Sequence, residues 1–402
     1  MLAYNPIFIS NLSIVKKSKQ WFSKQLISAE QMAAVLKKYN TEFYSPNLFV
    51  KIGLFIFTAF VIASAFGFLV FMLLQSNFKS SSEDNINAIL TIYFILFSIL
   101  CLVALEYFIK NNKLYKAGVD ECLLYSTFLF GYYAIETLTH KYYYFESDQL
   151  ILICIVAIPF FIAAIVRYAD RLVALSLIIC IYTICFLLLL KLGDIAKLIM
   201  PFALMLLSIP IYAASKKQQK NEVLVNYWEC FVVFEYIALL VFYLAGNYFV
   251  IRESSIQYFD LKLNPGEDIP LAFVFYIFTA IVPLLYVYFG LKKKDKILLW
   301  TGLTLVVAAA LTFKNYFSLG HPEITLTITG AIMIVIAYLS IKALKIPKYG
   351  ITFEEAPDED NFLKSNIEAI LIAQDFGQRS QVAPDVKFGG GDYGGGGSGG
   401  SF

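Results

Sequence analysis

Charged residues are scarce in this sequence. Asp, Glu, Lys and Arg together make up 15% of the 402 residues, whereas a soluble domain usually carries about 25%. Apolar residues account for 59% of the chain, and the mean hydropathy is +0.68. This composition excludes a water-soluble fold.

Histidine, arginine and metal-binding cysteine patterns are also scarce. The two histidines, His140 and His321, fall where the chain leaves an apolar run, so we expect no histidine-rich metal or haem site and no cofactor. Only four of the 32 basic residues are arginines, the preferred planar clamp for phosphate. The six cysteines lack CxxC spacing, which is typical of buried reduced thiols. The net charge of +2 is too balanced to indicate a nucleic-acid partner.

Apolar runs long enough to cross a lipid bilayer recur along the chain. A hydrocarbon core of roughly 30 Å needs about 20 helical residues at 1.5 Å per residue. The sequence therefore predicts an all-α fold, a polytopic transmembrane bundle of about ten spans in residues 48–342. We place the spans near residues 48–74, 88–109, 117–138, 150–166, 171–190, 197–213, 224–245, 269–290, 297–313 and 323–342.

The distribution of basic residues predicts the orientation of these spans. With the N-terminus inside, twelve basic residues fall in the short cytoplasmic loops and seven in the external loops. The positive-inside rule then places both termini in the cytoplasm.

Residues 1–47 form a basic segment ahead of the first span. One helix is expected from about Asn11 to Gln25, and a second from Ser28, which has capping-box spacing with Gln31. The two would form a hairpin with Trp21, Phe22 and Leu26 available for its seam. The outward lysines would either bind anionic lipid or simply retain positive charge on the cytoplasmic side; they are Lys16, Lys17, Lys19, Lys24, Lys37 and Lys38.

Several short motifs lie in the first 80 residues: Trp21, Ile27-Ser28, Glu30-Gln31, Tyr39, Lys51-Ile52-Gly53 and Gln75-Ser76-Asn77-Phe78. In these motifs the chain resembles a large bacterial family known only as "predicted membrane protein", domain of unknown function number twenty-one fifty-seven. An Asn-Trp pair commonly follows the first span in that family, and Asn77-Phe78 stands here instead. The resemblance implies a soluble helical segment before multiple spans of the bacterial inner membrane, and no assigned activity.

The last segment, residues 343–402, differs in composition from the spans. An acidic stretch at 354–360 precedes an expected short amphipathic helix from Asn361 to about Phe376, and a glycine-rich end follows Pro384. That end is too poor in apolar residues to form a core, and we expect it to be disordered. It would serve either as a docking tail for a protein partner, recognised through its aromatic residues, or as a flexible solubilising end.

The third and seventh spans share a pattern and hold most of the polar residues within the membrane. Tyr125 and Tyr132 match Tyr236 and Tyr243 at an offset of 111 residues, which indicates either repeated helical hairpins or chance similarity. Polar residues form one stripe on each span, and such stripes should face each other or a wet cavity. The candidates for a ligand or ion pathway are Glu121, Tyr125, Tyr132 and Glu136 in the third span, and Glu229, Tyr236, Tyr243 and Asn247 in the seventh.

Glu235 is a separate pathway candidate on the opposite face of the seventh span. It lies near the predicted mid-membrane, where none of the ten spans places a lysine or arginine. An unpaired charge there would cost at least about 2.5–3.5 kcal/mol, so we expect Glu235 to be neutral.

Three functions are compatible with these patterns. Polar residues that only hold helices together would suit a non-enzymatic scaffold or sensor. A secondary transporter or channel would use a pathway between the third and seventh spans. A membrane glycosyltransferase would rely on Glu83-Asp84 in the first external loop. No GxSxG, HExxH or GxxxxGK[ST] motif is present, so we expect the scaffold and no catalytic residues.

Overall fold

The computed structural model describes residues 2–77, 83–139, 142, 145–259 and 268–316, and single positions between 330 and 342. The chain divides into two units, Met1–Phe353 and Glu354–Phe402, and every described residue belongs to the first. The described residues form twelve α-helices and two short 3-10 helices, which confirms the all-α class. Apart from those single positions, the predicted tenth span and the segment 343–402 lie outside the described residues.

Two short helices, α1 (Pro6–Ser23) and α2 (Ala29–Lys38), form the N-terminal hairpin. The predicted start of the second helix is confirmed, because Ser28 and Gln31 form a reciprocal capping box. The predicted seam is wrong. Trp21, Phe22 and Leu26 lie at the exposed tip, and the buried side chains of the hairpin are instead Val15, Ser18 and Met32.

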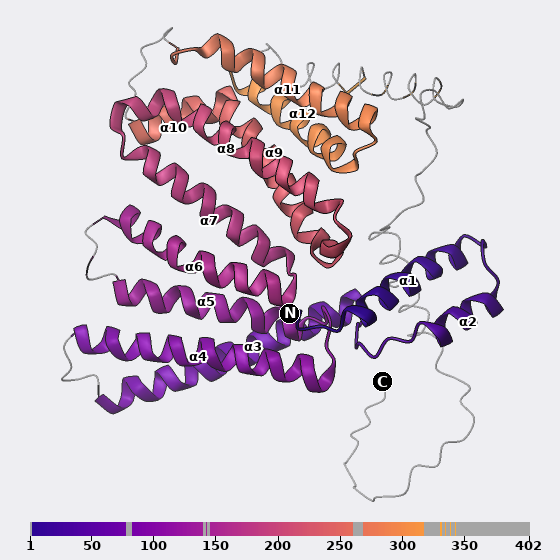
Figure 1. The fold of residues 1–402 in the computed structure, drawn as a ribbon. Coiled ribbons are helices and arrows are strands. Elements are labelled where there is room, and N and C mark those ends of the chain that lie inside the picture. The colour runs from indigo at the N-terminus through magenta and orange to yellow at the C-terminus, as the bar shows by residue number, and fades with distance from the viewer. Residues whose placement is uncertain are drawn as a thin grey trace, which may run out of the picture. The chain divides into compact units, whose positions relative to one another are not determined.

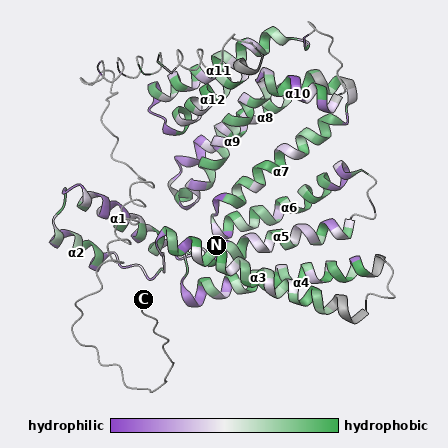
Figure 2. Cartoon of the chain, turned by 180° about the vertical axis from the view of Figure 1, so that it is seen from behind, coloured by the Kyte–Doolittle hydropathy of each residue, from purple (hydrophilic) through white to green (hydrophobic). Residues whose placement is uncertain are grey.

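The long helices follow the apolar runs. Their bounds are α3 (Leu48–Asn77), α4 (Glu83–Asn112), α5 (Val119–Thr139), α6 (Glu146–Tyr168), α7 (Arg171–Leu190), α8 (Ala196–Gln219), α9 (Trp228–Gly246), α11 (Ala272–Lys293) and α12 (Lys296–Tyr316). Three elements were not predicted: η1 (Gly193–Ile195), η2 (Glu222–Tyr227) and α10 (Tyr248–Phe259). The long helices are hydrophobic along most of their length (Figure 2).

Seven helical segments among the described residues are long and apolar enough to cross a membrane: Leu48–Met72, Ile86–Asn112, Glu146–Tyr168, Arg171–Leu190, Leu198–Gln219, Val223–Gly246 and Ala272–Lys293. The apolar part of α12, Lys296–Thr312, is shorter. α5 is not among the seven, since its tyrosine, threonine and glutamate side chains make it more polar. Large apolar side chains such as Phe60 and Leu206 are exposed, as lipid-facing residues should be. The chain therefore has the character of a multi-pass membrane protein.

Neighbouring helices pack side by side in an order that positions the polar residues (Figure 1). The closest pairs are α4 with α5, α8 with α9 and α11 with α12. α5 also contacts α3 and α6, α6 contacts α7, and α7 contacts α9. Aromatic rings fill the seam of α3, α4 and α5, where the Phe66 ring lies 5.3 Å from Phe94 and 5.1 Å from Phe130. α6 and α7 thus lie between α5 and α9.

Candidate functional site

The loop between α4 and α5, residues 113–118, is the centre of the main polar site. Lys113, Lys116 and Gly118 all have positive φ, at 50°, 49° and 97°, so the loop turns sharply. At Gly118 a glycine is required, because a Cβ there would lie 2.2 Å from the Lys51 carbonyl oxygen at the start of α3. The loop therefore fits tightly against the first long helix.

Asp120, in the first turn of α5, holds this loop closed. Its carboxylate accepts hydrogen bonds from the backbone N–H groups of Lys116 and Ala117, both at 2.8 Å. It also accepts one from the Tyr4 hydroxyl at 3.3 Å. Burial and the nearby Asp120 charge raise the pKa of Tyr4 well above its usual range, so Tyr4 remains a hydrogen-bond donor. Asp120 thereby joins the loop to the N-terminal segment.

The N-terminal segment is attached to the helix bundle at both of its ends. Before α1, the Ala3 N–H donates to the Arg167 carbonyl oxygen at the end of α6, at 2.7 Å. After α2, Tyr44 forms a backbone bridge with the loop, in which its N–H donates to the Lys113 carbonyl and its carbonyl accepts from Tyr115.

Side chains reinforce the second attachment. Glu42 pairs with Lys113, and the Phe43 ring stacks on Tyr115 with centroids 5.1 Å apart. Burial and the Glu229 charge raise the pKa of Tyr115 to about 12. Both chain ends of the hairpin are therefore fixed.

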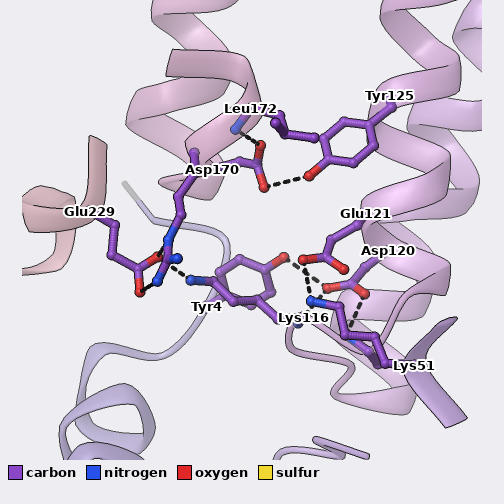
Figure 3. A network of polar contacts seen from close by, with 11 residues as sticks. Tyr4, Lys51, Lys116, Asp120, Glu121, Tyr125, Asp170, Leu172 and Glu229 are labelled. Carbon is purple, nitrogen blue, oxygen red and sulfur yellow. Dashed lines mark hydrogen bonds and ion pairs between the residues drawn. The ribbon is translucent and has the colours of Figure 1, made fainter. Parts of the chain in front are cut away.

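Ion pairs around the loop join α3 to α5, α7 to α9, and the loop itself to α9 (Figure 3). Lys51 Nζ lies 2.7 Å from Glu121 Oε1. Glu229 accepts a two-pronged contact from Arg171, at 2.8 and 2.5 Å, and also pairs with Lys116. Four helices are thus linked at one end of the bundle.

Asp170 completes this site at the start of α7. It accepts from the backbone N–H groups of Leu172 and Val173, at 2.9 and 3.0 Å, as an N-cap. It also accepts from the Tyr125 hydroxyl at 3.1 Å. We refer to the whole set as the polar network; its members are Tyr4, Lys51, Lys116, Asp120, Glu121, Tyr125, Asp170, Arg171 and Glu229.

The structure brings together only some of the predicted pathway residues. Glu121, Tyr125 and Glu229 belong to the polar network, whereas Tyr132 and Tyr236 lie on exposed faces. α5 and α9 do not pack along their lengths, since α6 and α7 lie between them.

The remaining candidates lie elsewhere. Glu136 is half-buried on α5, and its backbone carbonyl accepts from Gln149 of α6. Tyr243 and Asn247 are buried toward α12, where Asn247 Nδ2 lies 2.9 Å from the Tyr243 hydroxyl and 3.2 Å from Thr312 Oγ1. The polar residues that were predicted to form one stripe on each span therefore lie at two different ends of the bundle.

Glu235 has a cationic partner, so the expectation that no lysine or arginine lies within its reach is wrong. The residue is fully buried on α9, and its Oε1 lies 2.7 Å from Lys216 Nζ. The two atoms form an ion pair, but their geometry is not that of a hydrogen bond. The other carboxylate oxygen, Oε2, accepts a hydrogen bond from Gln219 Nε2 at 2.6 Å. Lys216 also lies 2.7 Å from Asp295.

Glu235 reaches Lys216 because α8 and α9 do not begin and end where the sequence predicted. α8 continues to Gln219, six residues beyond the predicted end of its span, and α9 begins at Trp228. Glu235 consequently lies about two turns after the start of α9, within reach of Lys216 near the end of α8.

Six members of the polar network were not predicted as site residues: Tyr4, Lys51, Lys116, Asp120, Asp170 and Arg171. Asp120 and Asp170 had a readable signal. Asp170 directly precedes an apolar helical run, where an N-cap aspartate is favoured, and Asp120 lies in the first turn of another, where acidic residues are favoured. Tyr4 had none, because its partner is 116 residues away.

Within the part of the chain that the structure describes, no group of three or more His, Cys, Asp or Glu side chains is arranged to hold a metal ion. The acidic members of the polar network instead face lysine, arginine, tyrosine and backbone donors. What the arrangement can do chemically is to fix parts of the chain to one another.

Comparisons with known proteins find no family model, curated protein or solved structure that matches this chain. The motifs behind the family resemblance have identifiable places in the structure. Ser28 and Gln31 form the capping box of α2, Lys51 belongs to the polar network, and Trp21 is exposed at the hairpin tip.

Proposed function

We propose that this chain is a non-enzymatic, multi-pass scaffold of the bacterial inner membrane that holds its N-terminal hairpin in a fixed position at the cytoplasmic face. The observation that carries the proposal is the double attachment of the hairpin, through Ala3 and Tyr4 at one end and Tyr44 at the other. A segment tethered at one end would swing freely, whereas a segment held at both ends keeps one orientation. We also propose the membership of the predicted membrane protein family that the first 80 residues suggest.

Pairing of the charged side chains supports a structural role over a transport pathway. Glu121 and Glu229 contact Lys51, Arg171 and Lys116, and Glu235 contacts Lys216. A transported ion would have to compete with these bonded cations for the same carboxylates. Side chains engaged in this way stabilise helix contacts.

The exposed surface of the hairpin supports a protein partner. Six lysines of the hairpin are exposed, and Trp21, Phe22 and Leu26 lie exposed at its tip. α1 and α2 extend past the ends of the long helices (Figure 1). An aromatic and basic surface held away from the bundle suits an acidic protein partner better than the bilayer surface.

Photo-crosslinking in cells tests this function. A photo-reactive amino acid at Trp21 or Leu36 should give a discrete protein adduct, because both side chains are exposed on the hairpin. The adduct should weaken when Lys19 and Lys24 are changed to Glu. The matched control is the same amino acid at Ile195, an exposed apolar position in η1. Adducts with lipid alone from the hairpin, or adducts from Ile195 of the same kind, would argue against the scaffold.

A further inference from the structure

A recess separate from the polar network lies among α8, α9, α11 and the start of α12. Its volume is about 230 Å³, and its walls include Ile209, Tyr212, Leu239, Phe242, Tyr286 and Phe289. Ile209 and Phe289 at its rim are 53% and 38% exposed, whereas Ser208 and Ala238 at its base are each 1% exposed. The recess therefore opens at the surface of the bundle and ends in its interior.

The lining of the recess selects an apolar occupant. The Ser208 hydroxyl is already hydrogen-bonded to Tyr182 at 2.8 Å, and the Tyr286 hydroxyl donates to the Leu239 carbonyl at 3.3 Å. A polar ligand would find these groups engaged and would lose its own hydration. The volume is also below the roughly 300 Å³ at which pockets for whole small molecules begin, so it suits a single hydrocarbon chain.

A cation lies at the rim of the recess. Lys293, the last residue of α11, lines it, and its Nζ lies 5.6 Å from the centroid of the Phe289 ring. Residues 292–296 contain four lysines and one carboxylate, Asp295, which is engaged by Lys216 at 2.7 Å. Among the described residues, Lys293 forms no ion pair. Its charge is therefore available to an anion at the mouth of an apolar recess.

We propose that this recess binds an anionic phospholipid from the surrounding bilayer, with one acyl chain in the recess and the phosphate on Lys293. The apolar walls account for the acyl chain, and the Lys293 ammonium at the mouth of the recess accounts for the preference for a negative headgroup. The site is distinct from the lysines of the hairpin and does not depend on the proposed scaffold role.

Lipid titration of the purified full-length protein tests the site. Phosphatidylglycerol and phosphatidylcholine with identical acyl chains are added in non-ionic detergent, and bound lipid is counted by native mass spectrometry. Wild-type protein should prefer phosphatidylglycerol. Lys293→Gln should weaken phosphatidylglycerol binding about fivefold and leave phosphatidylcholine unchanged, because one lysine near a headgroup contributes about a fivefold factor. Ile209→Trp fills the exposed rim and should weaken both lipids.

Lys110→Gln is the matched control, since Lys110 is an exposed lysine in the last turn of α4 and does not line the recess. It should bind both lipids as wild type does. Equal binding of the two lipids by wild-type protein would overturn the proposal, as would equal losses in Lys293→Gln and Lys110→Gln. Displacement of phosphatidylglycerol by inorganic phosphate would show a simple anion site and would also overturn it. Circular dichroism confirms that each variant is folded.

Discussion

Asp120 accepts three hydrogen bonds on one buried carboxylate, and it is the member of the polar network that joins the loop to the N-terminal segment. Two backbone donors of the loop and the Tyr4 hydroxyl converge on it. Asp120→Ala removes an acceptor from three donors, and we expect it to lower the free energy of unfolding by about 3 kcal/mol. Tyr4→Phe removes one donor and should cost about 1 kcal/mol. Thermal unfolding in detergent measures both, and equal effects of the two variants would contradict the assignment.

Substitution of Gly118 is expected to lower the stability of the protein. Gly118→Ala forces a side chain into a positive-φ position against the Lys51 carbonyl, and should cost about 2 kcal/mol or more. Gly53→Ala is the control, because Gly53 lies in α3 with open space around its Cα. Alanine is the better helix former, so that variant should be neutral or slightly stabilising. Similar melting temperatures for the two variants would show that the loop is not tightly packed.

At the scale of the helices, the sequence predicted what is local. The apolar runs and the Ser28 capping box each lie within a short window, and the structure contains the corresponding helices. The end of α8 could not be predicted in the same way. Lys216 and Lys217 indicate an exit from the membrane, yet lysine and glutamine are good helix formers, so the helix continues past the apolar run. This difference between the end of a span and the end of a helix gives Glu235 its partner.

The contact between α8 and α9 can be tested by a double-mutant cycle. Lys216→Met leaves Glu235 buried without its cation, and we expect a loss of about 3–5 kcal/mol. Adding Glu235→Leu should recover much of that loss, because no buried charge then remains on α9 at this position. The readout is the free energy of unfolding of the single and double variants. A double variant less stable than Lys216→Met would contradict the pairing.

At the scale of the whole molecule, the class of protein was predictable and the site was not. Composition alone indicates membrane helices, since each span corresponds to one continuous apolar run of the sequence. The polar network instead joins residues far apart in sequence, such as Tyr4 with Asp120 and Lys116 with Glu229. The predicted stripes on α5 and α9 failed to meet along their lengths because helical spacing fixes a face but not the neighbouring helix. Which helices are neighbours depends on the packing order, and here α6 and α7 lie between α5 and α9.

The fixed position of the hairpin is the central claim, and a distance measurement between spin labels tests it most directly. Labels at Ser13, exposed on α1, and Lys110, exposed at the end of α4, report the hairpin relative to the bundle. The cysteines for labelling are placed in a cysteine-free background of the full-length protein. We predict one narrow distance distribution, which broadens in the Tyr4→Phe/Glu42→Gln variant because each end of the hairpin loses a side-chain contact. A broad distribution in the unaltered hairpin, or no broadening in that variant, would contradict the account.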